Sequence, residues 1–241
     1  MRINVTTSVA GSILALLACM APLAGAAGVA DLPLVETPAT PPAAQSPRFM
    51  LFLSGDGGWA SLDKTVAARV AQSGMSVVGL NSRKYFWAAR TPDATTRDVE
   101  RILRHYLQVW HKTEISLAGY SFGADVMPVI VNRLPADLKA RITNISLIAL
   151  GRDATWEVHA LDWVPGLAAV GDPIDVELAN LPKVPLLCLY GAGENSLCTS
   201  LGKDRAIVGT IGKGHHFGGD YDEVADRVLE FSRGQSPLTS H

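Results

Sequence analysis

A serine between two glycines is the residue of this chain best suited to nucleophilic chemistry. Ser121 stands in G-Y-S-F-G (119–123), between an apolar run and a helical pattern over 125–134. A serine hydroxyl attacks a carbonyl well only if it is exposed, next to a base and near donors for the developing oxyanion. A strand–turn–helix with glycines around serine, called a nucleophile elbow, exposes the hydroxyl. Ser121 is therefore the candidate nucleophile, with an ordinary glycine-rich turn as the alternative.

Two later loops carry the partners that such a serine needs. An imidazole takes the serine proton, and a carboxylate fixes its tautomer and stabilises its protonated form. In sheets with this elbow, the acid and then the histidine follow in loops after later strands. Glu194 follows one apolar run, with Asp153 as the reserve acid, and His215 follows another. We prefer His215 to the neighbouring His216 because, in Gly-His-x-Phe, the first imidazole can turn back toward the elbow.

A glycine-rich loop, S-G-D-G-G-W (54–59), follows the first apolar run of the predicted domain. Oxyanion donors in such sheets are the N–H after the nucleophile, here Phe122, and one N–H from this loop, from Asp56 or Gly57. A phosphate-binding loop is the competing interpretation. It is disfavoured because no Gly-Lys-Ser/Thr follows and no acid stands where a dinucleotide ribose would need it. We expect neither a cofactor nor a metal ion.

Basic and aromatic residues cluster in S-R-K-Y-F-W (82–87), directly after the second apolar run. Core packing accounts for some of these rings. Arg83 and Lys84 beside aromatic rings also suit an amphiphile with an anionic head group. Trp87 and, in the glycine-rich loop, Trp59 are the candidate apolar contacts of such a substrate.

Strand-like runs alternate with amphipathic helical patterns from about Arg48 onward, which predicts a doubly wound, mostly parallel α/β sheet covered on both faces. The expected strands are 48–54, 76–81, 114–120, 144–150, 184–190 and 206–211, and the expected helices lie near 61–73, 92–111, 122–134 and 220–233. Residues 152–183 interrupt the alternation with Pro, Gly, Asp and two tryptophans. Ligand sites in such sheets lie at the carboxyl ends of the strands, so this insertion is expected to roof the site.

The N-terminus has the pattern of an export signal. Arg2 precedes an apolar run, 9–17, and an A-x-A pattern ending at Ala26, so 1–26 is expected to be a signal peptide and the mature protein periplasmic. The run is shorter than the roughly 20 residues of a transmembrane helix. Lipidation at Cys19 is the second choice, because the residues after it stay apolar. We expect a Pro/Ala-rich lead-in over 27–47, one folded domain over 48–234 and a tail over 235–241.

Charge and cysteine content indicate which partners and which covalent cross-link the protein can have. The formal net charge is −2, and removal of Arg2 with the signal makes it more negative, which argues against a nucleic-acid partner. Cys188 and Cys198 are then the remaining cysteines. An even pair in an exported chain predicts a disulfide, with two free buried thiols as the alternative.

Five ordered segments carry a resemblance to a known family. They are L-F-L-S-G-D-G-G-W (51–59), S-R-K-Y-F-W (82–87), G-Y-S-F-G-A-D (119–125), Y-G-A-G-E-N-S-L-C (190–198) and G-H-H-F-G-G-D-Y (214–221). The chain resembles the bacterial VirJ/AcvB virulence-protein family from about Arg48 to Phe231, and looks like its short VirJ type. The resemblance implies an exported domain of the α/β-hydrolase type with Ser121, Glu194 and His215 as a catalytic triad.

The resemblance leaves two functions open. AcvB-type members are similar to hydrolases of lysyl-phosphatidylglycerol, which implies a periplasmic serine esterase acting on an aminoacylated phospholipid at the membrane surface. Its substrate phosphate would then contact Arg83 or Lys84, and its ammonium groups could contact carboxylates, namely Asp56, Asp125 and Glu157. VirJ-type members have been linked to type IV secretion, which implies a non-catalytic adaptor that binds exported or secretion-system proteins. We prefer the enzyme, because an adaptor does not need serine, acid and histidine in this order.

Overall fold

The computed structural model describes residues 1, 28–40, 46–159 and 171–235. Most of the predicted signal peptide, Cys19, the middle of the predicted roof and all but the first residue of the predicted tail lie outside the described residues. Among the helices in the described ranges, none is long and apolar enough to cross a membrane.

Seven strands of the described residues form one sheet in the order β1-β3-β2-β4-β5-β8-β9. All neighbours are parallel except β1, which runs antiparallel to β3. The strands are β1 (Leu34–Thr37), β2 (Arg48–Leu53), β3 (Val77–Leu80), β4 (Glu114–Tyr120), β5 (Ile142–Ile148), β8 (Leu186–Ala192) and β9 (Ile207–Lys213). The chain goes from β2 outward to β3 and then crosses back to β4, which is the doubly wound arrangement that the sequence predicts.

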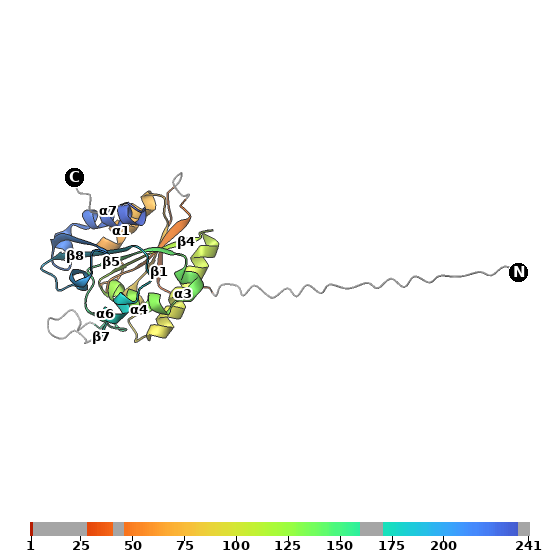
Figure 1. Cartoon of the computed structure of the whole chain (residues 1–241), viewed down its shortest axis with the longest axis horizontal. Coiled ribbons are helices and arrows are strands. Elements are labelled where there is room, and N and C mark those ends of the chain that lie inside the picture. Colours follow the sequence, from red (N-terminus) through yellow and green to blue (C-terminus); the bar gives the residue numbers. More distant parts are fainter. Residues whose placement is uncertain (2–27, 41–45, 160–170, 236–241) are drawn as a thin grey trace.

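Helices cover both faces of this sheet (Figure 1). The longer ones are α1 (Ser61–Gln72), α3 (Pro92–Val109), α4 (Phe122–Arg133) and α7 (Tyr221–Ser232), and the short ones are α2 (Ser82–Tyr85), α5 (Ala136–Lys139), α6 (Asp175–Ala179), η2 (Leu197–Ser200) and η3 (Phe217–Gly219). Along β2, Met50 and Phe52 pack toward α1 and α7, while Leu51 and Leu53 pack toward α3 and α4. Because a strand buried on both faces needs apolar side chains at every position, the continuous apolar run identifies it.

The domain begins earlier than the sequence predicts. Strand β1 lies inside the lead-in assigned to 27–47, whereas the domain was expected to start near Arg48. Leu34 packs against the core, and the Tyr106 hydroxyl donates to Glu36 Oε1 at 2.6 Å. Prolines on both sides of this strand give the segment the composition of a tether. An edge strand pairs on one side only, so these prolines cost it no internal hydrogen bond.

The segment after β5 was expected to be an irregular roof. Its described parts form a two-stranded ribbon, β6 (Asp153–Ala154) with β7 (Asp172–Pro173), followed by α6. The Trp156 carbonyl accepts from Arg90 N–H, and Val158 N–H donates to the Phe86 carbonyl, so this segment packs beside the turn after α2. Residues 160–170 lie outside the described residues, and the roof over the site stays a prediction.

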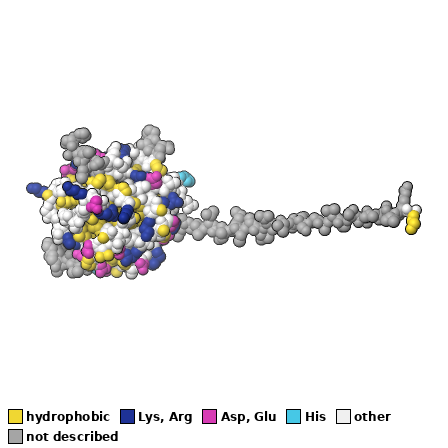
Figure 2. All heavy atoms as spheres, viewed as in Figure 1, with side chains coloured by type: hydrophobic (Ala, Val, Ile, Leu, Met, Phe, Trp, Pro, Cys, Tyr) yellow, Lys and Arg dark blue, Asp and Glu magenta, His cyan; other side chains and the backbone are white. Residues whose placement is uncertain are grey.

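Hydrophobic side chains reach the surface in patches among basic and acidic ones (Figure 2). The largest exposed ring in the described ranges is that of Trp87, which is 57% exposed.

Candidate active site

Ser121 occupies a strained turn between β4 and α4. Its φ of 51° and ψ of −121° are sparsely populated for a residue with a side chain, and such strain concentrates at functional sites. A Cβ on Gly119 would lie 2.5 Å from the Gly123 carbonyl oxygen, and a Cβ on Gly123 would lie 2.2 Å from that of Leu53. Both glycines are therefore required for the turn to close, as a nucleophile elbow demands.

The structure brings Ser121, His215 and Glu194 together. Ser121 Oγ lies 2.6 Å from His215 Nε2, and His215 Nδ1 lies 2.5 Å from Glu194 Oε1. Both distances are within hydrogen-bond reach, and each ring nitrogen faces the partner that a general base requires. The Gly191 N–H donates to Glu194 Oε2 at 2.8 Å, so both carboxylate oxygens have partners. Glu194, rather than the reserve candidate Asp153, is therefore the carboxylate that contacts His215.

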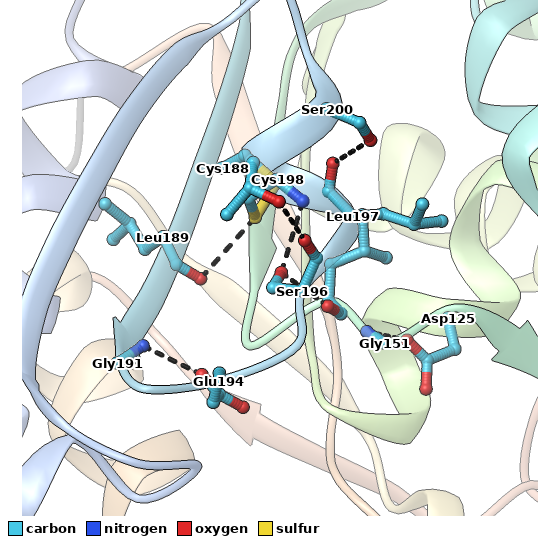
Figure 3. The surroundings of a disulfide bond; sticks show 12 residues. Asp125, Gly151, Cys188, Leu189, Gly191, Glu194, Ser196, Leu197, Cys198 and Ser200 are labelled. Carbon is cyan, nitrogen blue, oxygen red and sulfur yellow. Dashed lines mark hydrogen bonds between the residues drawn. A yellow bond between two sulfur atoms is a disulfide. The ribbon is translucent and has the colours of Figure 1, made fainter.

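The loop that carries Glu194 is attached to the rest of the domain at two places. A disulfide joins Cys188 on β8 to Cys198 in η2, and Glu194 lies between them in the chain (Figure 3). The Ser196 hydroxyl donates to the Leu150 carbonyl at 2.6 Å, which attaches the same loop to the end of β5. The acid loop is therefore attached to β8 itself and to the residues that follow β5, the neighbouring strand.

His216 contacts Tyr120, whereas His215 contacts the serine. Its Nδ1 lies 2.9 Å from the Tyr120 hydroxyl, which also donates to the His215 carbonyl at 3.3 Å. The Tyr120 ring stacks on the His215 ring, with centroids 5.8 Å apart. Burial raises the pKa of the Tyr120 phenol above its usual value, so it remains a donor. Sequence analysis missed Tyr120, although its place directly before the nucleophile was an available signal.

The glycine-rich loop after β2 lies beside the nucleophile. A Cβ on Gly55 would be 3.6 Å from Ser121 Cβ and 3.1 Å from the Tyr120 ring. Phe122 begins α4, so its N–H has no acceptor within the helix. The Gly57 N–H donates to Asp56 Oδ1 at 2.9 Å, which disfavours Gly57 as the second oxyanion donor.

Asp63 supports this loop from beneath and was not among the predicted residues. It is 1% exposed, and its Oδ2 accepts from the Ala60 N–H at 2.9 Å at the start of α1. Burial raises the pKa of Asp63 to about 6, although the N–H groups of Ala60, Asp63 and Gly55 act to lower it. An acid three positions after a helix N-cap residue, here Ala60, is the sequence signal that could have identified Asp63.

Asp125 is less available than the sequence suggests. Its Oδ1 accepts from the Gly151 N–H at 2.7 Å, and its side chain lies against the backbone at the end of β5 (Figure 3). Burial raises the pKa of Asp125 to about 8, and Asp153, Asp56 and Glu194 add to the rise. Asp125 is therefore largely protonated at neutral pH unless a cation binds beside it. Glu157 pairs with His159 at 3.3 Å and lines a pocket with Arg90 and Asp172, a different pocket from the groove beside the nucleophile.

The predicted aromatic and basic residues line one groove of about 550 Å³, formed by Gly57, Gly58, Trp59, Asn81, Arg83, Lys84 and Trp87. Trp59 covers Gly79, where a Cβ would lie 2.1 Å from the indole, and it meets Phe52 edge-on with centroids 5.7 Å apart. The Arg83 guanidinium lies 6.0 Å from the Trp87 ring centroid. Trp59 is therefore partly a core residue, while Trp87 is a surface residue.

No three His, Cys, Asp or Glu side chains of the described ranges are grouped as a metal site requires. The arrangement can support acyl transfer by a serine nucleophile with a histidine base.

The sheet, the elbow and the loops at its edge define the α/β-hydrolase fold. A family model described as "Bacterial virulence protein (VirJ)" matches residues 47–235, and the chain belongs to this family. None of the curated protein sequences matches it significantly.

Solved structures share the fold at low sequence identity. Est1E from Butyrivibrio proteoclasticus is 12% identical with a TM-score of 0.62, over 84% of this chain and 93% of that one. MenH from S. aureus is 15% identical with a TM-score of 0.60, over 83% and 98%. A serine hydrolase without a lid from Xanthomonas campestris is 15% identical with a TM-score of 0.51, over 86% and 90%.

Proposed function

We propose that this protein is a serine esterase. The observation that carries the proposal is the chain of contacts from Ser121 Oγ through His215 to Glu194, with distances of 2.6 and 2.5 Å. An unreactive serine would have no need of a strained turn, an aligned imidazole and a carboxylate held at both oxygens.

In the proposed reaction, Ser121 Oγ attacks the ester carbonyl carbon while His215 Nε2 takes the hydroxyl proton. Glu194 stabilises the imidazolium that forms. The N–H groups of Phe122 and Asp56 donate to the oxyanion, and His215 then protonates the departing alcohol. A water molecule, deprotonated by His215, cleaves the acyl-enzyme and restores the free serine.

Labelling with a fluorophosphonate tests this assignment. The reagent should form a covalent adduct that mass spectrometry locates on Ser121, and neither Ser121→Ala nor heat-unfolded protein should be labelled. An adduct on a different residue, or equal labelling of the unfolded chain, would contradict the assignment.

We further propose that the substrate is an aminoacyl ester of phosphatidylglycerol, lysyl-phosphatidylglycerol first, and that the site of action is the periplasm. Three features support this. The sequence resembles AcvB-type proteins. Arg83 and Lys84 line a groove together with Gly57 of the glycine-rich loop (54–59), which we call the catalytic loop. Asp56 and Asp125 lie near the triad as partners for ammonium groups. The disulfide between Cys188 and Cys198 is compatible with export.

A further inference from the structure

The segment after β3 concentrates basic charge on the surface. Residues 82–91 contain Arg83, Lys84 and Arg90 and no acid, in a chain whose formal net charge is −2. All three cations and Trp87 are exposed. Arg83, Lys84 and Trp87 line one groove, and we call these three residues the basic–aromatic rim, whereas Arg90 packs over the Tyr85 ring and lines another pocket. The Arg83 guanidinium lies 6.0 Å from the exposed Trp87 ring, so cations and an apolar ring stand side by side there, as a partner with negative charge and an apolar part requires.

The rim is attached rigidly to the catalytic loop. The Ser82 N–H donates to Ser54 Oγ at 2.9 Å, and the Ser82 hydroxyl donates to the Ser54 carbonyl at 2.6 Å. Ser82 and Ser54 are both fully buried, so these bonds are shielded from water. The start of the rim is thereby fixed to the start of the loop that carries the proposed oxyanion donor.

A second attachment joins the rim to the nucleophile elbow. Phe86 is fully buried, and its ring centroid lies 4.7 Å from that of Phe122, the residue after Ser121. The next residue, Trp87, points to the surface and is 57% exposed. The exposed Trp87 therefore follows directly after a residue that packs against the elbow. This contact fixes the orientation of the rim's backbone relative to Ser121.

The rim also borders an open groove beside the site. Gly57 and Gly58 of the catalytic loop line this groove of about 550 Å³ together with Arg83, Lys84 and Trp87. A Cβ on Gly57 would meet nothing within 4 Å, so the loop leaves free space on this side. A molecule held at the rim can therefore extend along the catalytic loop toward Ser121.

Exposed tryptophan and neighbouring cations are the side chains that bind the interface of an anionic bilayer. Indoles favour the head-group region, and each Lys or Arg near an anionic surface adds to the attraction. We propose that the basic–aromatic rim docks this protein on anionic phospholipid bilayers and so presents Ser121 to the lipid–water interface. This inference rests on the proposed function in that a lipid ester must be reached at a bilayer, but the docking itself requires no cleavage.

Cosedimentation with vesicles tests the docking. The protein carries Ser121→Ala, so that lipid is not consumed, and the vesicles contain either equal parts of phosphatidylglycerol and phosphatidylcholine or phosphatidylcholine alone. Binding should prefer phosphatidylglycerol and weaken as salt rises. Lys84→Gln should weaken binding about fivefold and Trp87→Ala about tenfold, so the double variant should lose on the order of fiftyfold. Thermal unfolding checks that each variant is folded.

The matched control is Val176→Ala with Lys183→Gln, an exposed apolar residue on α6 and an exposed lysine before β8. It should bind as tightly as the parent. Equal binding by the rim and control variants, or no preference for phosphatidylglycerol, overturns the proposal. Full competition by soluble glycerol phosphate also overturns it, in favour of a small phosphate site. Docking by the active protein without release of lysine from lysyl-phosphatidylglycerol supports the rim and contradicts the proposed substrate.

Discussion

Ser121 can hold its reactive conformation only because Gly119 and Gly123, two positions away on each side, let the turn close. Its φ of 51° aims Oγ at His215, and the backbone, rather than the hydroxyl, maintains the turn. Ser121→Ala should therefore leave the thermal unfolding temperature nearly unchanged. It should lower hydrolysis of a soluble short-chain ester by at least about a thousandfold, the usual order of loss for a triad residue. An unchanged rate would remove Ser121 as nucleophile.

The two adjacent histidines should differ sharply when each is replaced. His215→Ala removes the only imidazole that contacts Ser121 among the described residues, so its loss should resemble that of the serine variant. His216→Ala removes the partner of the Tyr120 hydroxyl at 2.9 Å and should cost about tenfold or less, because it disturbs only a support of His215. Rates measured on both variants at matched thermal stability decide this; the opposite ranking would make His216 the base.

Asp125 should make stability depend on pH. Burial raises its pKa to about 8 in the folded protein, well above the ordinary value of 3.8. Between these two values the folded state holds a proton that the unfolded state has lost. The contribution of Asp125 to stability is therefore fully present below pH 3.8 and is lost as pH rises through about 8. Asp125→Asn keeps an acceptor for Gly151 and removes this decline. We expect it to unfold about ten degrees above the wild type at alkaline pH and at the same temperature near pH 4.

Unfolding scans across that pH range check the Asp125 prediction. Asp204→Asn replaces an exposed carboxylate in the turn before β9 and serves as the control. A wild-type stability that does not fall between pH 5 and pH 8.5 relative to Asp125→Asn would show that the Asp125 carboxyl ionises normally.

At the scale of elements, the strands that could be predicted are those whose every position is buried. Residues 49–53 of β2 are all fully buried, so a continuous apolar run shows where the strand lies. Strand β1 could not be predicted, because an edge strand needs few apolar residues and its flanking prolines suggest a tether. Two-residue strands such as β6 carry no periodicity, and their pairing with β7 depends on contacts between distant parts of the chain.

Some contacts of the candidate site could likewise be predicted from the sequence, and others could not. Topology places the acid loop and the histidine loop after later strands, so the order Ser121, Glu194, His215 could be predicted from the motif. The contact between Tyr120 and His216 joins residues 96 positions apart, and loop geometry alone determines it. For Asp125, the sequence showed a helical turn after the serine but not the Gly151 backbone that its carboxylate meets.

The disulfide should matter for catalysis because it closes the loop that holds the acid. Replacing both Cys188 and Cys198 by alanine should cost about 3 kcal/mol of unfolding free energy in the chain-entropy model. We expect kcat to fall while KM changes little, because Glu194 is displaced from His215 and the groove is untouched. Reductant should lower wild-type activity and leave the double variant unaffected. Full activity of a verified reduced sample would contradict this coupling.

At the scale of the whole molecule, the distribution of charge around the triad predicts substrate choice. A lysyl ester of phosphatidylglycerol carries two ammonium groups near the scissile carbonyl and one phosphate farther away. Asp56 and Asp125 lie near Ser121, whereas Arg83 and Lys84 lie along the adjacent groove. An ammonium beside Asp125 also favours its ionised form, so binding should lower the raised pKa of this carboxyl. Acidic groups near the bond and basic groups farther away match this lipid better than a neutral triglyceride.

The purified protein should therefore release lysine from lysyl-phosphatidylglycerol in vesicles, measured by mass spectrometry. A desolvated carboxylate–ammonium contact can give a preference on the order of a hundredfold in kcat/KM over an uncharged acyl ester of the same lipid. Asp56→Asn and Asp125→Asn should each reduce this preference, and Asp204→Asn should not. Since both asparagine variants keep the triad, their rates on a soluble neutral ester separate a lost ammonium contact from a damaged catalytic centre. Equal turnover of lysyl and fatty-acyl esters by the wild type would exclude the charge-based selection, while Ser121 labelling would still identify a serine esterase.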